Sequence, residues 1–590
     1  MGAVVGIMSW HKPPDGGDVR AMLDASPHRG SARRIASVGS GLLGICNHPG
    51  EADSTLAVEG DVGVAFLGSL DNLAELAADL RMSSSRCTPA EVVAFGYRTW
   101  GSRVVDRMRG AYAAVIADGE RIVCLRDHVG FRPLFYRAEE SRFFFATEAK
   151  QVVAGAGLPR RPDFEALQTV FYSGISENAS LRGVKRLMAA EVIDVDRESL
   201  ISRRYWDPGP LVESARLSPF DAREQLVAQL DRAVRRSMTG ADAIALSGGI
   251  DSTTIAAFAS RAVSEGQRPP VAFTYVYPEH RSVDESRFTR TVAEALGLEL
   301  LEHSLVAGPL DELEQWVDVA DGPWDTLPIP WAVEGFRLAR SAGATNVLFG
   351  DLAEYLFTLT SGLLGHLFYR RRWRSLGKYL ASLHERGANP RNINRALLRE
   401  IIPTPLLNTY YRRAGRSQFY FPPWVDPGVV GASRELELSG SQRGRWVASQ
   451  LAATRGTTTT MEATEIAAAF AGVTIRRPFA DVDLWEFVLS LPAEIKFPDS
   501  VPKSLVRQAM RGRVPDVILD RNEKTVFDEH ALSTAQVGRL RQLIDPTTYR
   551  MEGVDYAHLN RLLDSEVLNV NDIIWAHDLA KVHAFVDRLS

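Results

Sequence analysis

The sequence has few cysteines, no long hydrophobic run and no strong excess of charge of one sign. Its three cysteines, Cys46, Cys87 and Cys124, lack the spacing of a metal site or a disulfide framework, so we expect a reducing, cytoplasmic location. No apolar run approaches the roughly 18 residues needed to cross a bilayer, and the first ten residues lack the basic start of a signal peptide. The net charge of −5 excludes a globally basic nucleic-acid binder. We therefore expect neither a membrane nor a nucleic acid as partner.

The 590 residues are 45% hydrophobic, which is enough for two or more cores, because single domains usually split beyond about 250–300 residues. A change of composition at Trp206–Pro210 precedes an amphipathic helix predicted over Pro219–Met238. We place the domains at residues 1–208 and 219–590. In the first domain, turn residues separate short segments that are typical of strands. These segments are Ala3–Met8, Val62–Leu67, Gly110–Ala117, Arg121–Leu125 and Phe143–Ala146.

The second domain begins with alternating strands and helices. A strand at Ala243–Leu246 leads through a glycine-rich loop into a helix at Thr253–Ala262. A strand at Val271–Tyr277 and a helix at Glu285–Leu296 follow. This alternation predicts an α/β domain with a parallel sheet. Beyond Met461 the pattern is mostly helical.

The loop Ser247–Thr253 reads Ser-Gly-Gly-Ile-Asp-Ser-Thr between an apolar strand and a helix. Backbone N–H groups at such a helix start form an anion site suited to pyrophosphate. The loop lacks the lysine of the kinase and GTPase loop, which favours cleavage between the α and β phosphates of ATP. Alone, such a loop is often only a tight connection. The residues expected to bind ATP are Leu246, Ser247, Gly248, Gly249, Asp251, Ser252 and Gly350.

Two further acids follow a second apolar strand, in the stretch from Val347 to Glu354. Asp351 and Glu354 are three residues apart, so on the first turn of a helix both would face one site. We expect Asp251 and Glu354 to hold Mg²⁺ together with substrate phosphates. Asp351 is the candidate catalytic base or orienter. The plain alternative is that both acids stabilise a helix N-terminus through its dipole.

A third element is the stretch Arg521–Phe527, which contains Lys524. A lysine at this point would neutralise charge on the α-phosphate as pyrophosphate leaves. Taken alone, Lys524 would be a solvated loop lysine.

Together with Arg476–Asp481 and Lys503–Met510, these elements resemble the synthetase domain of the asparagine synthetase family in content and order. The resemblance covers nearly the whole chain. It assigns ATP binding to Ser247, Gly248, Gly249 and Ser252, magnesium to Asp251 and Glu354, and stabilisation of the acyl-adenylate to Lys524. One departure concerns the acids, because the family usually reads G-E-G-S-D-E where this chain reads Gly-Asp-Leu-Ala-Glu-Tyr from Gly350.

The first domain contains segments that resemble a class II glutamine amidotransferase, an αββα sandwich. They are His28–Gly30, Asp127–Tyr136 and Phe145–Lys150. Glutaminase chemistry in that class needs a cysteine exposed by removal of Met1, because its free α-amine assists the thiol. Residue 2 is Gly2, so we expect no glutaminase activity. Asp127, Arg132 and Glu148 are then expected to make structural hydrogen bonds instead of binding substrate.

A helical, basic and aromatic segment at about 360–425 follows the acids. Between Leu367 and Ser417 the sequence has 12 Arg and Lys residues against two Glu. This composition suits a peptide or a partner protein, although a solvated helix face is the plain alternative. The chain thus resembles a lasso-peptide macrolactam synthetase with an inactive amidotransferase domain.

That resemblance implies a short precursor peptide as substrate, and a leader-binding protein and a leader peptidase as partners. The alternatives are a β-lactam synthetase or another small-molecule amide synthetase, an ammonia-dependent asparagine synthetase, and a scaffold without activity.

Overall fold

The computed structural model describes residues 2–83, 87–172, 176–263, 268–324, 328–358, 362–385, 387–413, 422–426, 445–451, 458–498, 501–521, 528–565 and 568–590. Within these ranges, no helix combines the length and the apolar character that crossing a bilayer requires.

The N-terminal half contains two six-stranded antiparallel sheets. The first has the order β10 (Lys185–Arg186), β8 (Phe135–Ala138), β9 (Arg142–Ala146), β1 (Ala3–Ser9), β3 (Gly41–Asn47) and β2 (Ala32–Val38). The second has the order β12 (Leu200–Arg204), β11 (Glu191–Val195), β7 (Arg121–Arg126), β6 (Tyr112–Asp118), β5 (Val62–Gly68) and β4 (Ser54–Glu59).

Both faces of these sheets are covered. Along β6, Val115 points into the core between the sheets, whereas Ile116 packs under the helices outside. This alternation follows from the two-residue period of a strand. Helices α1 (Gly16–Asp24) and α4 (Ala149–Gly155) cover the first sheet, and α2 (Leu73–Asp79) and α3 (Pro89–Trp100) accompany the second. The layers are therefore α, β, β and α.

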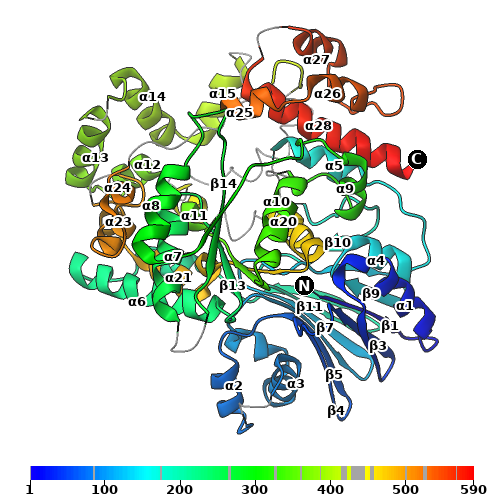
Figure 1. Ribbon diagram of the computed structural model, residues 1–590. Coiled ribbons are helices and arrows are strands. Elements are labelled where there is room, and N and C mark those ends of the chain that lie inside the picture. The colour runs from blue at the N-terminus through cyan, green and yellow to red at the C-terminus, as the bar shows by residue number, and fades with distance from the viewer. Residues whose placement is uncertain are drawn as a thin grey trace.

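A parallel five-stranded sheet forms the centre of the second half, as predicted. Its order is β15 (Leu300–His303), β14 (Val271–Tyr275), β13 (Asp242–Ala245), β16 (Asn346–Leu348) and β17 (Thr474–Arg476). Helices α6 (Pro219–Ser237), α7 (Ile250–Ala262) and α8 (Ser286–Leu296) lie on one side, and α10 (Ile329–Ser341) and α20 (Thr458–Ala471) on the other (Figure 1).

The remaining described helices do not belong to these layers. The described residues of the basic segment form α12 (Leu363–Tyr369), α13 (Trp373–Glu385), α14 (Pro390–Ile401) and α15 (Thr404–Arg413), so these parts are helical as expected. The others are α5 (Phe164–Gln168), α9 (Leu313–Val319), α11 (Ala353–Phe357), α18 (Arg445–Leu451), α21 (Val482–Ser490), α22 (Ala493–Lys496), α23 (Ser504–Met510), α24 (Asp516–Leu519), α25 (Asp528–Ser533), α26 (Val537–Leu543), α27 (Tyr556–Leu563) and α28 (Val570–Leu589).

Buried ion pairs join the two halves. Arg132 pairs with Glu465 on α20, and neither side chain is exposed. Arg186 lies 2.7 Å from Glu462 on the same helix. Because a buried charge is costly without a partner, these pairs fix the orientation of the sandwich on the parallel-sheet half.

Candidate active site

The glycine-rich loop connects β13 to α7. Gly248 has a left-handed φ of +68°, which a residue without a side chain adopts at little cost, and Gly249 is the N-cap of α7. The Ser252 hydroxyl accepts a hydrogen bond from the Ser247 backbone N–H at 3.1 Å. The loop is therefore closed on itself and presents the start of a 13-residue helix, which suits a phosphate group.

A second loop approaches it from β16. At Gly350, an added Cβ would lie 3.1 Å from the Ser252 nitrogen, so the backbones of the two loops are nearly in contact. Asp351 does not lie on the first turn of a helix, which corrects the prediction. Helix α11 begins only at Ala353, because Leu352 adopts a left-handed φ of +77°. Asp351 therefore stands in the turn, and Glu354 on the helix.

The two loops border a cavity of about 300 Å³ at the carboxyl ends of β13, β14 and β16. This end of a parallel sheet is where α/β proteins bind their ligands. Seven of the predicted residues line the cavity: Leu246, Ser247, Asp251, Ser252, Gly350, Asp351 and Glu354. The other described residues of the lining are ones that the sequence did not assign to the site: Ala245, Phe273, Thr274, Tyr275, Tyr277, Val283, Glu285 and Phe349.

Four carboxylates line this cavity, those of Asp251, Glu285, Asp351 and Glu354. Loss of hydration raises the pKa of Glu354, and the negative charges of Asp351 and Asp251 raise it further. Lys503 lies 2.5 Å from Asp251, and Arg477 lies 3.1 Å from Asp351. Carboxylate oxygens are the ligands that Mg²⁺ prefers, but the described residues contain no group of three or more His, Cys, Asp or Glu side chains arranged to hold a metal ion. Asp251 and Glu354 therefore fit magnesium only as a pair, with substrate phosphates as the further ligands.

Arg521 contacts the glycine-rich loop at Gly248. Its guanidinium donates to the Gly248 carbonyl at 3.4 Å and to Glu285 at 2.5 Å, and lies 4.3 Å from the centre of the Phe288 ring. Lys524, three positions further on, lies outside the described residues, and its role stays a prediction. The stretch Arg521–Phe527, which contains Lys524, therefore begins beside the glycine-rich loop.

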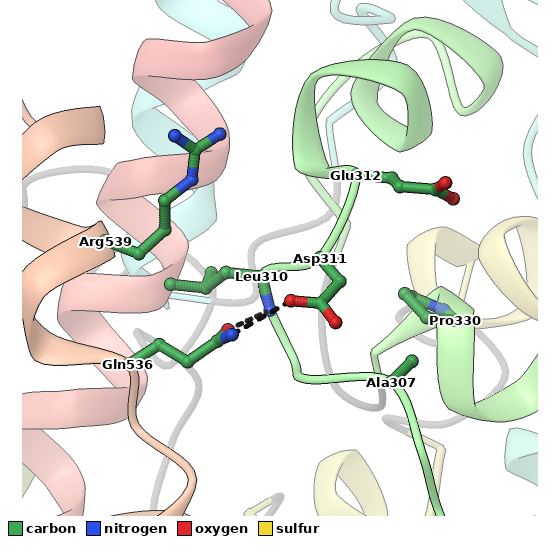
Figure 2. Close-up of a pocket in the computed structure, with 7 residues that line it drawn as sticks. All are labelled: Ala307, Leu310, Asp311, Glu312, Pro330, Gln536 and Arg539. Carbon is green, nitrogen blue, oxygen red and sulfur yellow. Dashed lines mark hydrogen bonds between the residues drawn. The ribbon is translucent and has the colours of Figure 1, made fainter.

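A larger hollow lies elsewhere, between the segment after β15 and α26 (Figure 2). Its volume is about 520 Å³. Gln536 bridges its two sides, accepting from the Leu310 backbone N–H and donating to Asp311, both at 2.9 Å. The residues described as lining it include none of those expected to bind ATP, so we place the candidate site in the smaller cavity.

In the sandwich, the position just before β1 has no space for a side chain. A Cβ on Gly2 would overlap the Cys46 carbonyl oxygen, the Ser54 hydroxyl and the Asn47 amide oxygen. A cysteine at this position would require the surrounding strands to move.

The other residues expected to be structural make the following contacts. Asp127 accepts backbone hydrogen bonds from Val129, Phe131 and Arg132 within one turn. Glu148 is buried against Ser26, His28, Arg29 and Lys150. Burial alone would raise the pKa of Glu148, but the charges of His28, Lys150 and Arg29 hold it well below its usual value.

Sequence reasoning missed the roles of Lys503, Arg477 and Arg521. All three belong to motifs recognised in the sequence, but their partners lie 252, 126 and 273 positions away. The available signal was a basic residue inside each motif. It gave no indication of which acid or carbonyl each would meet.

Comparisons with known proteins agree with this architecture. Residues 1–206 match the glutamine amidotransferase domain, and residues 225–582 match asparagine synthase. Asparagine synthetase [glutamine-hydrolyzing] 3 of Bacillus subtilis is 25% identical over 547 residues, covering 85% of this chain and 82% of the relative. Asparagine synthetase [glutamine-hydrolyzing] 1 of the same organism is 24% identical over 501 residues, covering 78% and 74%.

A third relative matches a shorter stretch. The carboxyethyl-arginine beta-lactam-synthase of Streptomyces clavuligerus is 30% identical over 203 residues, which is 34% of this chain and 37% of that protein. The asparagine synthase match spans more than half of the chain and contains both loops of the cavity. The chain therefore belongs to the asparagine synthase family of ATP-dependent amide ligases.

Proposed function

We propose that the protein is a lasso-peptide macrolactam synthetase. A side-chain carboxylate of Asp or Glu in a short precursor peptide attacks the α-phosphate of ATP, giving an acyl-adenylate and pyrophosphate. The N-terminal amine of the same peptide then attacks the acyl carbon. The amide bond closes a ring, AMP leaves, and the amine loses a proton.

The first step is supported by the cavity between the two loops. The apolar side chains of Leu246, Phe273 and Phe349 suit a nucleobase, and the loop Ser247–Ser252 suits the phosphates. We assign magnesium to Asp251 and Glu354; when bound there, it would screen the charge of the phosphate oxygens.

Asp351 is the candidate base for the attacking amine. Its side chain lines the cavity and is 41% exposed, so a substrate amine has access to it. A carboxylate in that position can accept a hydrogen bond from the amine and take its proton. Lys524 is proposed to stabilise charge on the adenylate.

The observation that carries the choice of amine is Gly2. Because a side chain at this position would overlap three neighbours, the site where a glutaminase of this class needs its thiol is closed. Cys46 and Cys124 are buried, and burial raises the pKa of both thiols. None of the three cysteines, including the partly buried Cys87, carries the α-amine that assists the thiol in this class, so we assign the amine to the substrate itself.

A peptide substrate is supported by the basic segment. Helix α14 has no buried residue, and it displays Arg391, Arg395 and a Leu398 that is 55% exposed. Trp373 on α13 is 54% exposed, and Tyr410 on α15 is 61% exposed. A basic surface with apolar anchors suits an acidic segment of a peptide or of a leader-binding protein.

This surface is separate from the nucleotide. Helices α13 and α14 lie at the periphery of the molecule (Figure 1). Among the described residues, none from this segment lines the ATP cavity. We therefore assign it to the part of the peptide remote from the ring, or to the leader-binding protein, and a leader peptidase would complete the set of partners.

The alternative is a β-lactam synthetase or a similar enzyme for small molecules, which the Streptomyces relative favours. Asparagine synthesis from ammonia is a further alternative, supported by the names of the Bacillus relatives.

The test is incubation of the protein with ATP, magnesium and candidate precursor peptides. Mass spectrometry should find a product lighter by one water, with AMP and pyrophosphate formed in equal amounts. An N-acetylated peptide, which lacks the attacking amine, should give no ring. Turnover of a small amino-acid derivative or of aspartate with ammonia, without reaction of any peptide, would favour an alternative.

A further inference from the structure

Arg477 is a fully buried arginine that contacts a residue of the active-site cavity. Its Nε atom donates to Asp351 at 3.1 Å, and its Nη2 atom donates to the Thr464 hydroxyl at 2.6 Å. The Arg477 side chain has no exposed surface, whereas that of Asp351 is 41% exposed. The arginine thus holds one oxygen of a carboxylate that otherwise faces the cavity.

The third neighbour of Arg477 comes from the other half of the chain. Its guanidinium lies 4.7 Å from the centre of the Phe131 ring, which belongs to the sandwich. The guanidinium of Arg132 lies 4.8 Å from the same ring. Arg132 also pairs with Glu465, next to Thr464 on α20. The Arg477 side chain is therefore held on one side by Phe131 and on the other by Thr464 of α20.

Phe131 is itself rigidly placed. Its backbone N–H donates to Asp127 at 2.9 Å, in the turn that Asp127 closes, and its side chain is 1% exposed. Planar stacking on an aromatic face restricts the rotation of a guanidinium, which an ammonium group would not experience in the same way. The ring therefore fixes the direction in which Arg477 presents its N–H groups.

The sheet explains why Arg477 reaches Asp351. Strand β17 pairs with β16 in parallel, with Arg476 opposite Leu348, and the Phe349 N–H donates to the Arg476 carbonyl at 3.0 Å. Arg477 and Asp351 therefore leave the same edge of the sheet on neighbouring strands. Arg477, directly after β17, is therefore placed to contact the turn before α11.

We infer that Phe131 of the amidotransferase-like domain fixes Arg477, and that Arg477 is a positioning residue which orients Asp351 toward the reacting groups. The sandwich is then a working part of the ligase site. The inference rests on the proposed function only for the identity of the step that Asp351 serves. The contact chain itself is independent of the substrate.

The experiment compares the full-length protein with its F131L and R477M variants. F131L removes the aromatic face and three side-chain carbons, and leaves an apolar side chain in place. We expect kcat for amide formation to fall about 10-fold in F131L and about 100-fold in R477M, because misplaced catalytic groups lose rate steeply. The KM for ATP in pyrophosphate exchange should change less than about twofold, since neither residue lines the nucleotide cavity. R477K should recover part of the loss.

The matched control is F144L. Phe144 is another buried ring of the sandwich, 4.9 Å from the guanidinium of Arg142, on a strand of the first sheet. F144L removes the ring on which Arg142 stacks, and this loss should leave kcat unchanged. An equal fall of kcat in F144L and F131L would show that any lost ring of the sandwich lowers activity through general destabilisation. This outcome would overturn the inference.

The F131L/R477M double variant tests this inference independently of the proposed function. If Phe131 acts through Arg477, F131L should cause no further loss of kcat in the R477M background, and the pair should also be non-additive in urea unfolding. Unfolding needs no substrate, so it reports on the contact even if every peptide fails to react. Additive effects of the two substitutions in unfolding, or an unchanged kcat in F131L, would overturn the inference.

Discussion

The ammonium group of Lys503 lies 2.5 Å from a carboxylate oxygen of Asp251, although 252 positions separate the two residues. Lys503 adopts a left-handed φ of +63° at the start of α23, and its backbone N–H donates to the Phe357 carbonyl at 2.8 Å. The lysine is thus placed by α11 and α23 against the loop that is proposed to hold phosphate.

Replacing Lys503 by methionine should weaken ATP binding. The substitution removes a positive charge beside the phosphates and leaves Asp251 without its cation, and a charge-assisted hydrogen bond contributes about 1.5–3 kcal/mol. We expect the KM for ATP in pyrophosphate exchange to rise about 10- to 100-fold. Lys378→Met, on the exposed helix α13, is the control. Equal KM values in both variants would contradict the assignment of Lys503.

Glu354→Gln and Asp351→Asn should impair different steps. Loss of a magnesium ligand should reduce pyrophosphate exchange about 10- to 100-fold and raise the magnesium concentration required. Asp351→Asn should retain exchange but lower amide formation by about 10²–10⁴-fold, the usual range for a lost general base. The two rates are measured separately, with labelled pyrophosphate and by mass spectrometry. An Asp351→Asn enzyme that forms the amide at the normal rate would remove Asp351 from the mechanism.

Gly2→Ala should destabilise the sandwich. The added methyl group overlaps backbone and side-chain oxygens, and overpacking of this kind costs about 1–3 kcal/mol. Urea unfolding of the sandwich should therefore shift to lower concentration. Gly16→Ala is the matched control, because a Cβ at Gly16 meets no atom within 4 Å. A stable Gly2→Ala variant would show that this position can accommodate a side chain.

Lys496 should make stability depend on pH. Burial lowers the pKa of Lys496 to about 8, with the charge of Glu213 acting in the opposite direction. Between the folded pKa and the usual lysine value, the unfolded chain binds more protons than the folded one, so stability rises with pH. From pH 8 to 9.5 we expect a gain of up to about 2 kcal/mol, at 1.36 kcal/mol for each pH unit. Lys496→Met should lack this rise, and parallel pH curves for the two proteins would contradict the assignment.

The elements that the sequence predicted well carry strong local patterns. Helix α6 was expected over Pro219–Met238 and spans Pro219–Ser237, since its apolar residues recur at helical spacing. Strand β6 was expected from Gly110 but begins at Tyr112, because Gly110 has a φ of +140°. Strand β2 was not predicted, since it is an edge strand whose residues are mostly exposed and show no clear alternation.

The site was predicted as a set of residues but not as a geometry. The glycine-rich loop and the acids of the second loop lie together because both follow strands of one parallel sheet, which the alternation of elements already implies. The helical placement of Asp351 was wrong, because nothing in the sequence indicates that Leu352 adopts a left-handed conformation. The cations that pair with the acids come from remote segments, and no local pattern determines their partners.

The position of strand β17 determines how this protein can be divided for expression. Strand β17 is the last strand of the parallel sheet, and the sandwich covers it: the Thr474 hydroxyl donates to Asp53 at 2.6 Å, and Arg132 donates to the Ile475 carbonyl at 3.4 Å. Cutting the chain between its halves would uncover that edge, and an uncovered edge strand is a template for pairing with other chains. The ligase half expressed by itself should therefore aggregate, and the two halves should be produced as one chain.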